Sequence, residues 1–289
     1  MISDKQLKFI KNEKKTTIMI RYGRILISMY SEEHKRFIRK KKITSILVHL
    51  VQILLIVSLI VIWELLAKYE VINTFISSSP SRIVNNIYSL LMSGNLFKHV
   101  WVTLSETLIA FFITLVISFI VSLLIYKSQT FSKIIDPYLT IFNSLPKVAF
   151  GPILIIWIGA NKRSIITMAI LISIIVSIQS ISVGLKNTNR NRIKILKIFG
   201  ANEYQILKYV LLPSNFKIII NTCKINIGMC LIGIVMGEFL TSKAGIGYLI
   251  LYGSQVFNLT LVMSGIVILL ILSIILYEII SIIEKHLDF

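Results

Sequence analysis

The sequence predicts an all-α membrane protein with six transmembrane helices. Of its 289 residues, 55% are hydrophobic and only 15% are charged, whereas about a quarter of the residues of a soluble domain are charged. The apolar residues are gathered into long runs, and a helix needs about 20 of them to cross a bilayer. The net charge of +18 comes from lysines and arginines that flank or interrupt these runs. Such flanking charges are expected from membrane topology, so no nucleic-acid partner is predicted.

Each expected helix is an apolar run of roughly spanning length. The six predicted spans are residues 43–67, 101–126, 137–158, 165–185, 218–240 and 259–283. The third is interrupted by Asn143, Pro146, Lys147, Gly151 and Pro152. Neighbouring helices can satisfy the carbonyls that a proline frees, so one kinked interior helix is expected there.

The distribution of basic residues predicts the orientation. With the N-terminus in the cytoplasm, 23 lysines and arginines lie inside and six lie outside. The positive-inside rule therefore predicts a multi-pass protein of the plasma membrane with both termini cytoplasmic. Residues 1–42 are a basic cytoplasmic extension, either a plain tail or a helix lying on anionic lipid, and residues 43–289 form the transmembrane domain. The segment of about 186–217 then faces the cytoplasm.

The sequence has none of the common signatures of a catalytic or metal site. It contains no phosphate-binding loop of the form G-x-x-x-x-G-K-[ST], no G-x-S-x-G, no H-E-x-x-H and only four histidines. Cys223 and Cys230 lie two helical turns apart in one span, about 10 Å from each other, which is too far for a disulfide. No catalytic residue, metal ligand or cofactor is predicted.

The cytoplasmic segment 186–217 carries the most informative pattern. A basic helix that includes Lys194 should end at Gly200, which suits a left-handed cap. A second helix should run from about Asn202 and end at Leu212-Pro213. Ile195, Phe199, Ile206 and Val210 can form an apolar patch rimmed by lysine. Such an elbow suits docking on another protein. The alternative interpretation is an ordinary interfacial loop with a glycine cap.

Polar residues within the predicted spans are the other candidates. Glu238 lies near the outer end of the fifth span, and an ionisable group in a span usually faces a cavity or a partner. It can equally be a hydrated helix-end carboxylate or a partner of Lys243. Asn143 and Pro146 can shape a path through the membrane because a kink frees carbonyls, or they can mark a packing kink only.

The elbow resembles the "EAA" loop of ABC-importer permeases. That loop reads roughly E-A-A-x-x-x-G-A and, about ten residues later, L-P. Gly200-Ala201 and Leu212-Pro213 match it in identity and spacing, whereas Lys194-Ile195-Leu196 departs from it.

Three further segments, in the expected order, resemble the nitrate/sulfonate/taurine/bicarbonate branch of these permeases. They are Ser79-Pro80-Ser81 with His99 and Thr103-Leu104; Asp136-Pro137 through Trp157-Ile158-Gly159; and Glu238 with Gly245-Ile246-Gly247-Tyr248. The resemblance covers about residues 43 to 289.

The resemblance implies a type I ABC importer permease fold. It implies a cytoplasmic ATPase that binds ATP, an extracytoplasmic substrate-binding protein and a second permease copy, with the two permeases forming a homodimer in the lipid bilayer. The residues implied to couple to the ATPase are Lys194, Phe199, Gly200, Ala201, Leu212 and Pro213. Those implied in the path or gate are Asn143, Pro146, Glu238, Gly245 and Gly247. The expected solute is a small anion such as nitrate, a sulfonate or taurine.

Two alternatives from other classes remain. An ion-gradient-driven secondary transporter would predict an inverted internal repeat, which the sequence does not display. A membrane scaffold or sensor that transports nothing would leave the elbow unexplained.

Overall fold

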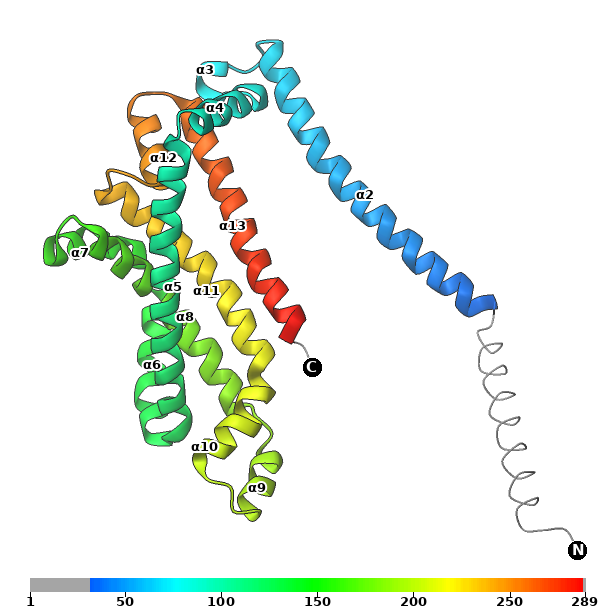
Figure 1. Cartoon of the computed structure of the whole chain (residues 1–289), viewed down its shortest axis with the longest axis vertical. Coiled ribbons are helices and arrows are strands. Elements are labelled where there is room, and N and C mark those ends of the chain that lie inside the picture. The colour runs from blue at the N-terminus through cyan, green and yellow to red at the C-terminus, as the bar shows by residue number, and fades with distance from the viewer. Residues whose placement is uncertain (1–31, 288–289) are drawn as a thin grey trace, which may run out of the picture. The chain divides into compact units, whose positions relative to one another are not determined.

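The computed structural model describes residues 32–287, which are helical throughout apart from short connections (Figure 1). The longer helices are α2 (Glu32–Lys68), α4 (Pro80–Met92), α5 (Asn95–Lys127), α6 (Gln129–Ser144), α8 (Lys162–Lys186), α11 (Leu212–Thr241) and α13 (Leu259–Leu287). The shorter ones are α3 (Thr74–Ser77), η1 (Lys147–Phe150), α7 (Gly151–Ile158), α9 (Arg190–Ile198), α10 (Glu203–Ile206), η2 (Leu207–Leu211) and α12 (Ile246–Gln255).

Helix α2 makes up most of a separate unit that ends at Leu65. No residue of its most apolar stretch is buried within this unit. At 1.5 Å per residue its 37 residues extend about 55 Å, more than the roughly 30 Å of a bilayer core. The predicted span 43–67 lies inside this helix. Most of the basic extension, residues 1–31, lies outside the described residues.

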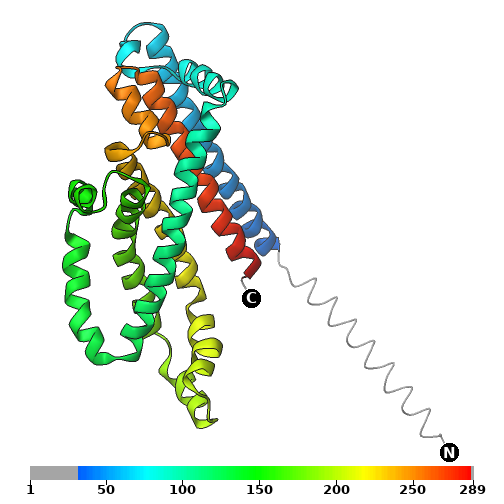
Figure 2. The ribbon, with the colours of Figure 1, turned by 60° about the vertical axis from the view of Figure 1, so that its left-hand side comes forward.

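The second unit begins at Leu66 and is built around α5, α8 and α11, which lie side by side (Figures 1 and 2). Helices α8 and α11 approach closely at two glycines. A Cβ at Gly233 would overlap the backbone of Ala169, and a Cβ at Gly237 would lie 2.9 Å from the Cα of Ile165. Small residues at such crossings let two helix backbones pack closely in a membrane, where the hydrophobic effect gives little drive for helix association.

Hydroxyl and thiol groups join the same three helices. Thr114 Oγ1 of α5 lies 3.1 Å from Ser173 Oγ of α8, and Ser122 Oγ donates to the carbonyl of Ile178 at 3.0 Å. Cys230 Sγ of α11 donates to Ser173 Oγ at 3.3 Å. Both cysteines are free and buried, in agreement with the sequence prediction. These polar contacts fix the relative positions of the helices inside an otherwise apolar core.

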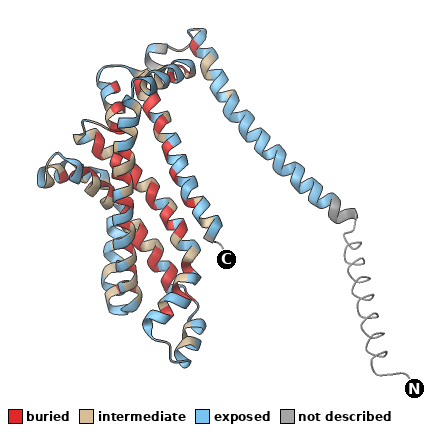
Figure 3. Cartoon of the chain, viewed as in Figure 1, coloured by how far each residue is buried: buried red, intermediate tan, exposed pale blue. Residues whose placement is uncertain are grey.

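Helix α13 covers one side of the bundle through contacts with α4, α11 and α12. Figure 3 shows the resulting pattern, with buried residues along the facing sides of α5, α8 and α11 and along one side of α13. Near the C-terminal end of α13, Lys224 Nζ and Glu284 Oε2 form an ion pair at 2.6 Å. The Lys224 ammonium also lies 5.2 Å from the ring centre of Tyr277. This pair ties α11 to α13.

The third predicted span differs most from expectation. A helix begins at Gln129, well before residue 137, and Pro137 lies inside it. The chain then breaks and continues as residues Lys147–Ile158, at 88° to α6. Pro146 disfavours a helical conformation of Leu145, which is extended at φ −75° and ψ 142°. The expectation of one kinked helix over 137–158 is therefore wrong; the segment is a broken pair.

Five helical segments of the described chain are long and apolar enough to cross a membrane, and there are six if the broken pair counts as one span. The predicted spans 101–126, 165–185, 218–240 and 259–283 each fall inside one of these segments. The all-α, six-span expectation is thus confirmed in the part of the chain that the structure describes.

Candidate functional site

The elbow at one end of the bundle consists of α9, Gly200, α10 and η2. Helix α9 ends in a Schellman motif, in which the N–H of Gly200 donates to the carbonyl of Lys197 and the N–H of Ala201 donates to that of Leu196, both at 3.0 Å. Gly200 has φ +78°, which confirms the predicted left-handed cap. A Cβ at Gly200 would have no atom within 4 Å. Backbone conformation therefore explains the glycine, and steric crowding does not.

The helix after Gly200 begins with a capping box. Asn202 Oδ1 accepts from the N–H of Gln205, and the N–H of Asn202 donates to Gln205 Oε1, both at 2.8 Å. Behind this turn, Ile206 and Leu211 pack with Ile181 and Leu185 of α8 in a small apolar cluster. The elbow is therefore attached to the spans through buried contacts and a defined turn.

The outward face of the elbow is apolar. Ile198 is 83% exposed and Phe199 is 84% exposed, and Ile195 and Tyr204 are exposed as well. The predicted patch was wrong for Ile206 and Val210, because both are buried. Helical spacing placed them on one apolar face, but that face packs on the bundle. The exposed patch comes from the end of α9 and the start of α10.

Leu212-Pro213 does not end the second helix, in contrast to the prediction. The chain stays helical from Glu203 to Thr241. Residues Leu207–Leu211 form a π-helical turn, and Pro213 follows it in the first turn of α11. Proline lacks an N–H, and the wider turn accommodates that loss without stopping the helix. The elbow thus continues directly into a transmembrane helix.

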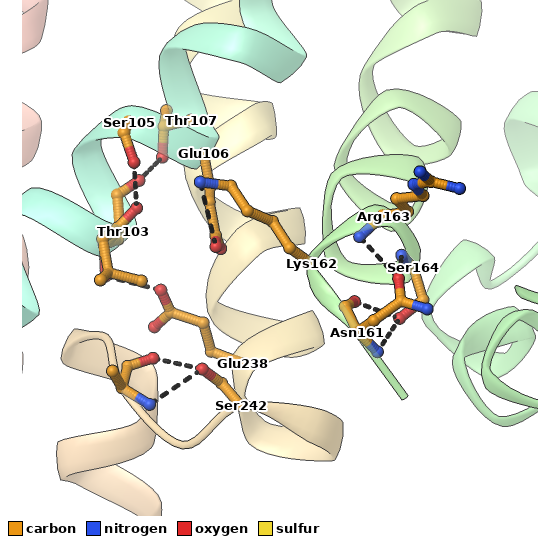
Figure 4. A network of polar contacts seen from close by, with 12 residues as sticks. Thr103, Ser105, Glu106, Thr107, Asn161, Lys162, Arg163, Ser164, Glu238 and Ser242 are labelled. Carbon is orange, nitrogen blue, oxygen red and sulfur yellow. Dashed lines mark hydrogen bonds and ion pairs between the residues drawn. The ribbon is translucent and has the colours of Figure 1, made fainter. Parts of the chain in front are cut away.

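At the other end of the bundle, Glu238 holds two segments together. Its side chain is fully buried. Thr103 Oγ1 of α5 donates to Glu238 Oε1 at 2.6 Å, and the N–H of Gly247 in α12 donates to Glu238 Oε2 at 2.6 Å. Thr103 Oγ1 also accepts from the N–H of Ile246 at 2.8 Å. Glu238 is therefore buried and is not paired with Lys243. Its contact with Thr103 joins α11 to α5 (Figure 4), and its contact with Gly247 joins α11 to α12.

The two glycines beside it make room for this carboxylate. A Cβ at Gly245 would overlap the Glu238 carboxylate, and Gly245 has φ +122°. A Cβ at Gly247 would lie 2.7 Å from Glu238 Oε2. His99 adds a further contact, since its Nδ1 accepts from the N–H of Gly245 at 3.0 Å. We name the set of His99, Thr103, Glu238, Gly245 and Gly247 the glutamate clasp.

A second carboxylate lies near the clasp on the same helix as Thr103. Glu106 is buried, and Lys162 Nζ lies 3.9 Å from its Oε1 (Figure 4). Its Oε2 has no hydrogen-bond partner among the residues that the structure describes. Lys162 begins α8, so this contact connects the N-terminal part of α5 to the start of α8.

Asn143 and Pro146 lie where the broken pair bends. Asn143 Oδ1 accepts from Lys147 Nζ at 3.2 Å, and both Asn143 and Pro146 are exposed within this chain. A cavity of about 480 Å³ lies alongside, between α6 and α8, and is lined in part by Thr140, Gln179 and Ser182. The bend therefore places polar groups within the broken pair.

The described residues contain no group of three or more histidine, cysteine, aspartate or glutamate side chains that could hold a metal ion. The elbow has an exposed apolar surface, and the clasp joins three helices. Neither group brings a nucleophile together with a base.

The family comparison agrees with this arrangement. Residues 117–289 match the family model described as "Binding-protein-dependent transport system inner membrane component". The chain belongs to this family. It is a membrane-spanning permease subunit of an ABC importer and a multi-pass inner-membrane protein. It is not the ATPase, because ATP is bound by a partner subunit of such systems, and a binding protein delivers the solute.

Curated relatives of this permease are distant. A probable ABC transporter permease of Haemophilus influenzae is 28% identical over 80% of this chain and 94% of its own length. The riboflavin transport system permease of Chloroflexus aurantiacus is 27% identical over 78% of this chain and 85% of its own. The taurine transport system permease of Escherichia coli is 22% identical over 75% and 81%.

Solved structures support the fold. The methionine ABC transporter MetNI, in an inward-facing conformation, matches with a TM-score of 0.60 and 20% identity over 68% of this chain and 98% of the matched chain. An amino acid ABC transporter matches with a TM-score of 0.55 and 13% identity, over 69% and 97%. At this identity the likeness shows the fold of the permease, which agrees with the type I importer fold predicted from sequence.

Sequence reasoning missed two of the five clasp residues as site residues. Glu238, Gly245 and Gly247 were proposed for a gate, whereas Thr103 and His99 entered only as parts of a resembling segment. A hydroxyl on a transmembrane helix gives no signal of its partner when that partner is 135 residues away. The roles of all these residues in transport are taken up below as proposals.

Proposed function

We propose that this permease carries a small organic anion of the sulfonate or taurine type across the bacterial plasma membrane, as one of two identical copies. Its elbow docks on the cytoplasmic ATPase, and its glutamate clasp keeps the outer end of the path in a defined shape. The observation that carries the proposal is the elbow, because it combines an exposed apolar face with rigid attachment to the spans.

Docking needs a surface that a partner can bury. Ile198 and Phe199 are among the most exposed large apolar side chains of the chain. Large apolar side chains on one patch mark protein interaction sites, and aromatic anchors contribute most to such interfaces. Lys194 and Lys197 lie beside them on α9 and give the patch a basic rim.

Coupling also needs a stiff connection from that surface to the spans. The continuous helix from Glu203 to Thr241 supplies one. It begins at the capping box beside Gly200, passes Leu212-Pro213 in its first turns and reaches Glu238 at its far end. Movement imposed on the elbow would therefore reach the clasp along one element, which supports the roles proposed for both groups.

The charge distribution supports the orientation, and the number of permease domains per chain supports the assembly. The 23-to-6 excess of basic residues supports a cytoplasmic elbow and cytoplasmic termini. One chain supplies one permease domain, so a transport path between two permeases requires a second copy. Two-fold symmetry is the common way to supply it.

The substrate class rests on the names of the relatives and on one lysine at the bend. The relatives include taurine and aliphatic sulfonate permeases at 21–23% identity. Lys147 beside Asn143 at the bend of α6 and η1 places a positive charge within the broken pair, which favours an anion as the solute. A second candidate is a heteroaromatic vitamin or precursor, since riboflavin and formylaminopyrimidine permeases are 27% and 26% identical.

The test is reconstitution of this permease with the ATPase and the binding protein of its own system in proteoliposomes. We expect binding protein loaded with taurine or an alkanesulfonate to stimulate ATP hydrolysis and solute uptake. The same protein without ligand should stimulate hydrolysis weakly and support no uptake. Stimulation by riboflavin or a pyrimidine and not by any sulfonate would reject the anion assignment and leave the permease assignment intact.

A further inference from the structure

A strongly basic cavity lies between the elbow and the ends of three helices. It has a volume of about 690 Å³ and is walled by α5, α6, α8, α9 and α10. Its basic lining residues are Lys127, Lys133, Lys186, Arg190, Lys194 and Lys197. One carboxylate, that of Glu203, lines it as well.

Most of these charges have no ion-pair partner among the described residues. Lys186 pairs with Asp136 at 2.9 Å. For the other five, no carboxylate of residues 32–287 lies within ion-pair distance. Like charges that converge on one concave surface repel each other and attract a counter-ion. The electrostatics of this cavity therefore favour an anion with more than one oxygen.

The position of the cavity suggests which anions can reach it. Lys127 is the last residue of α5 and Lys186 is the last residue of α8, and both helices are long and apolar enough to span a membrane. The cavity therefore lies where helices leave the apolar core, which is the level of lipid headgroups. Basic pockets between helices at this level bind anionic headgroups. Arginine and lysine are the side chains that proteins use most to bind phosphate, and Arg190 can do so with two parallel hydrogen bonds.

We propose that this cavity binds a phosphate group, supplied either by the headgroup of an anionic phospholipid or by free phosphate. The bound group would bridge the ends of α5, α6 and α8 to α9, the first helix of the elbow. Binding at this site does not depend on which solute the permease carries. Cavities of this size are typical of small-molecule sites.

The experiment measures ligand binding to the purified full-length chain by native mass spectrometry. The probes are phosphatidylglycerol, phosphatidylcholine and inorganic phosphate. The cavity variant Lys127→Gln/Lys133→Gln/Arg190→Gln removes three lining charges outside the proposed docking residues. The control Arg192→Gln/Lys208→Gln/Lys217→Gln removes three charges from the same end of the bundle, none of which lines the cavity.

We expect the wild type and the control to bind phosphatidylglycerol, and the cavity variant to bind it about tenfold or more weakly. Phosphatidylcholine should bind much less in all three. If inorganic phosphate binds wild type and competes with phosphatidylglycerol, the free anion is a ligand; if only phosphatidylglycerol binds, the lipid headgroup is the source.

A variant in the opposite direction separates binding from folding. Glu203→Gln removes the only carboxylate that lines the cavity among residues 32–287 and should tighten phosphatidylglycerol or phosphate binding. The melting temperature of each variant reports its folding. If the cavity variant binds both anionic probes as tightly as the control does, the proposal is overturned. Absence of binding by wild type, or equal affinity for phosphatidylcholine, would overturn it too.

Discussion

Gly200→Val tests the elbow most sharply because the structure isolates a single cause. Gly200 has φ +78°, and a Cβ there would meet no atom within 4 Å. The expected penalty is therefore backbone strain, on the order of 1–2 kcal/mol for a residue with a Cβ and more for a β-branched one. The chain can relieve that strain only by giving up the two 3.0 Å Schellman hydrogen bonds of Gly200 and Ala201.

That strain translates into a measurable loss of docking. A penalty of 1–2 kcal/mol lowers the population of the native elbow by about 5- to 30-fold relative to a rearranged one. ATPase binding by Gly200→Val should weaken by up to the same factor, and substrate-stimulated ATP hydrolysis should fall with it. Gly200→Ala should be milder. The spans keep their apolar length, so membrane levels should stay near those of wild type.

Gly94 provides a matched control in the same chain. It has φ +72° and, like Gly200, open space around an added Cβ. It lies at the start of α5, at the opposite end of that helix from the elbow (Figure 1). Gly94→Val imposes a comparable strain and should leave affinity for the ATPase unchanged. If Gly200→Val binds the ATPase as wild type does at equal expression, or if both variants lose binding equally, the reasoning about the elbow fails.

Four further predictions concern the clasp, the topology, the assembly and the elbow surface. Glu238→Ala leaves the donors of Thr103 and Gly247 without their buried acceptor, which costs about 1–3 kcal/mol for each donor. The melting temperature should therefore drop, and amide hydrogen exchange should become faster around residues 245–248. Glu238→Gln should have smaller effects, and unchanged hydrogen exchange in Glu238→Ala would contradict the role of the clasp. A cysteine at Asn202 should resist a membrane-impermeant thiol reagent added outside intact cells while a cysteine at Asn161 reacts, and the reverse pattern would overturn the orientation. The purified transporter should hold two identical permeases and two ATPase chains, and one permease for two ATPase chains would refute the pairing. Phe199→Ala should weaken ATPase binding without lowering the melting temperature, because Phe199 is 84% exposed; a large loss of stability with unchanged binding would assign Phe199 to the core.

The features that could be predicted from sequence are those set by local chemistry. Apolar runs set the spans because their length must match the bilayer. Gly200 could be predicted as a cap because glycine after a helical run, followed by Asn202, is a local signal of a left-handed turn. The order of the family's motifs along the chain gave the permease fold for the same reason: it requires no knowledge of tertiary contacts.

The features that could not be predicted depend on contacts between distant residues. Ile206 and Val210 share a helical face with the right spacing for a docking patch, but both are buried. Ile206 packs on Ile181 and Leu185 of another helix, which its own segment does not reveal. Pro213 could be taken for a helix end because it lacks an N–H, yet a π-helical turn before it absorbs the loss.

The broken pair and the clasp show the same limit. Pro146 signals a break in the third span, but no local rule gives a bend of 88°. Glu238 could be identified as an unusual charge in a span, while its partners Thr103 and Gly247 lie on other helices. Sequence reasoning therefore identified Glu238 but could not decide whether it belongs to a gate or is a hydrated helix-end carboxylate.

The most direct test of the central claim is site-specific photo-crosslinking from the elbow to the ATPase. A benzophenone amino acid in place of Phe199 is compared with one in place of Trp157, which is 78% exposed but lies on α7, away from the elbow. We predict an ATPase adduct from position 199 that forms in the assembled transporter, and none from position 157. Absence of an adduct from position 199, or equal adducts from both positions, would contradict docking of the ATPase on this elbow.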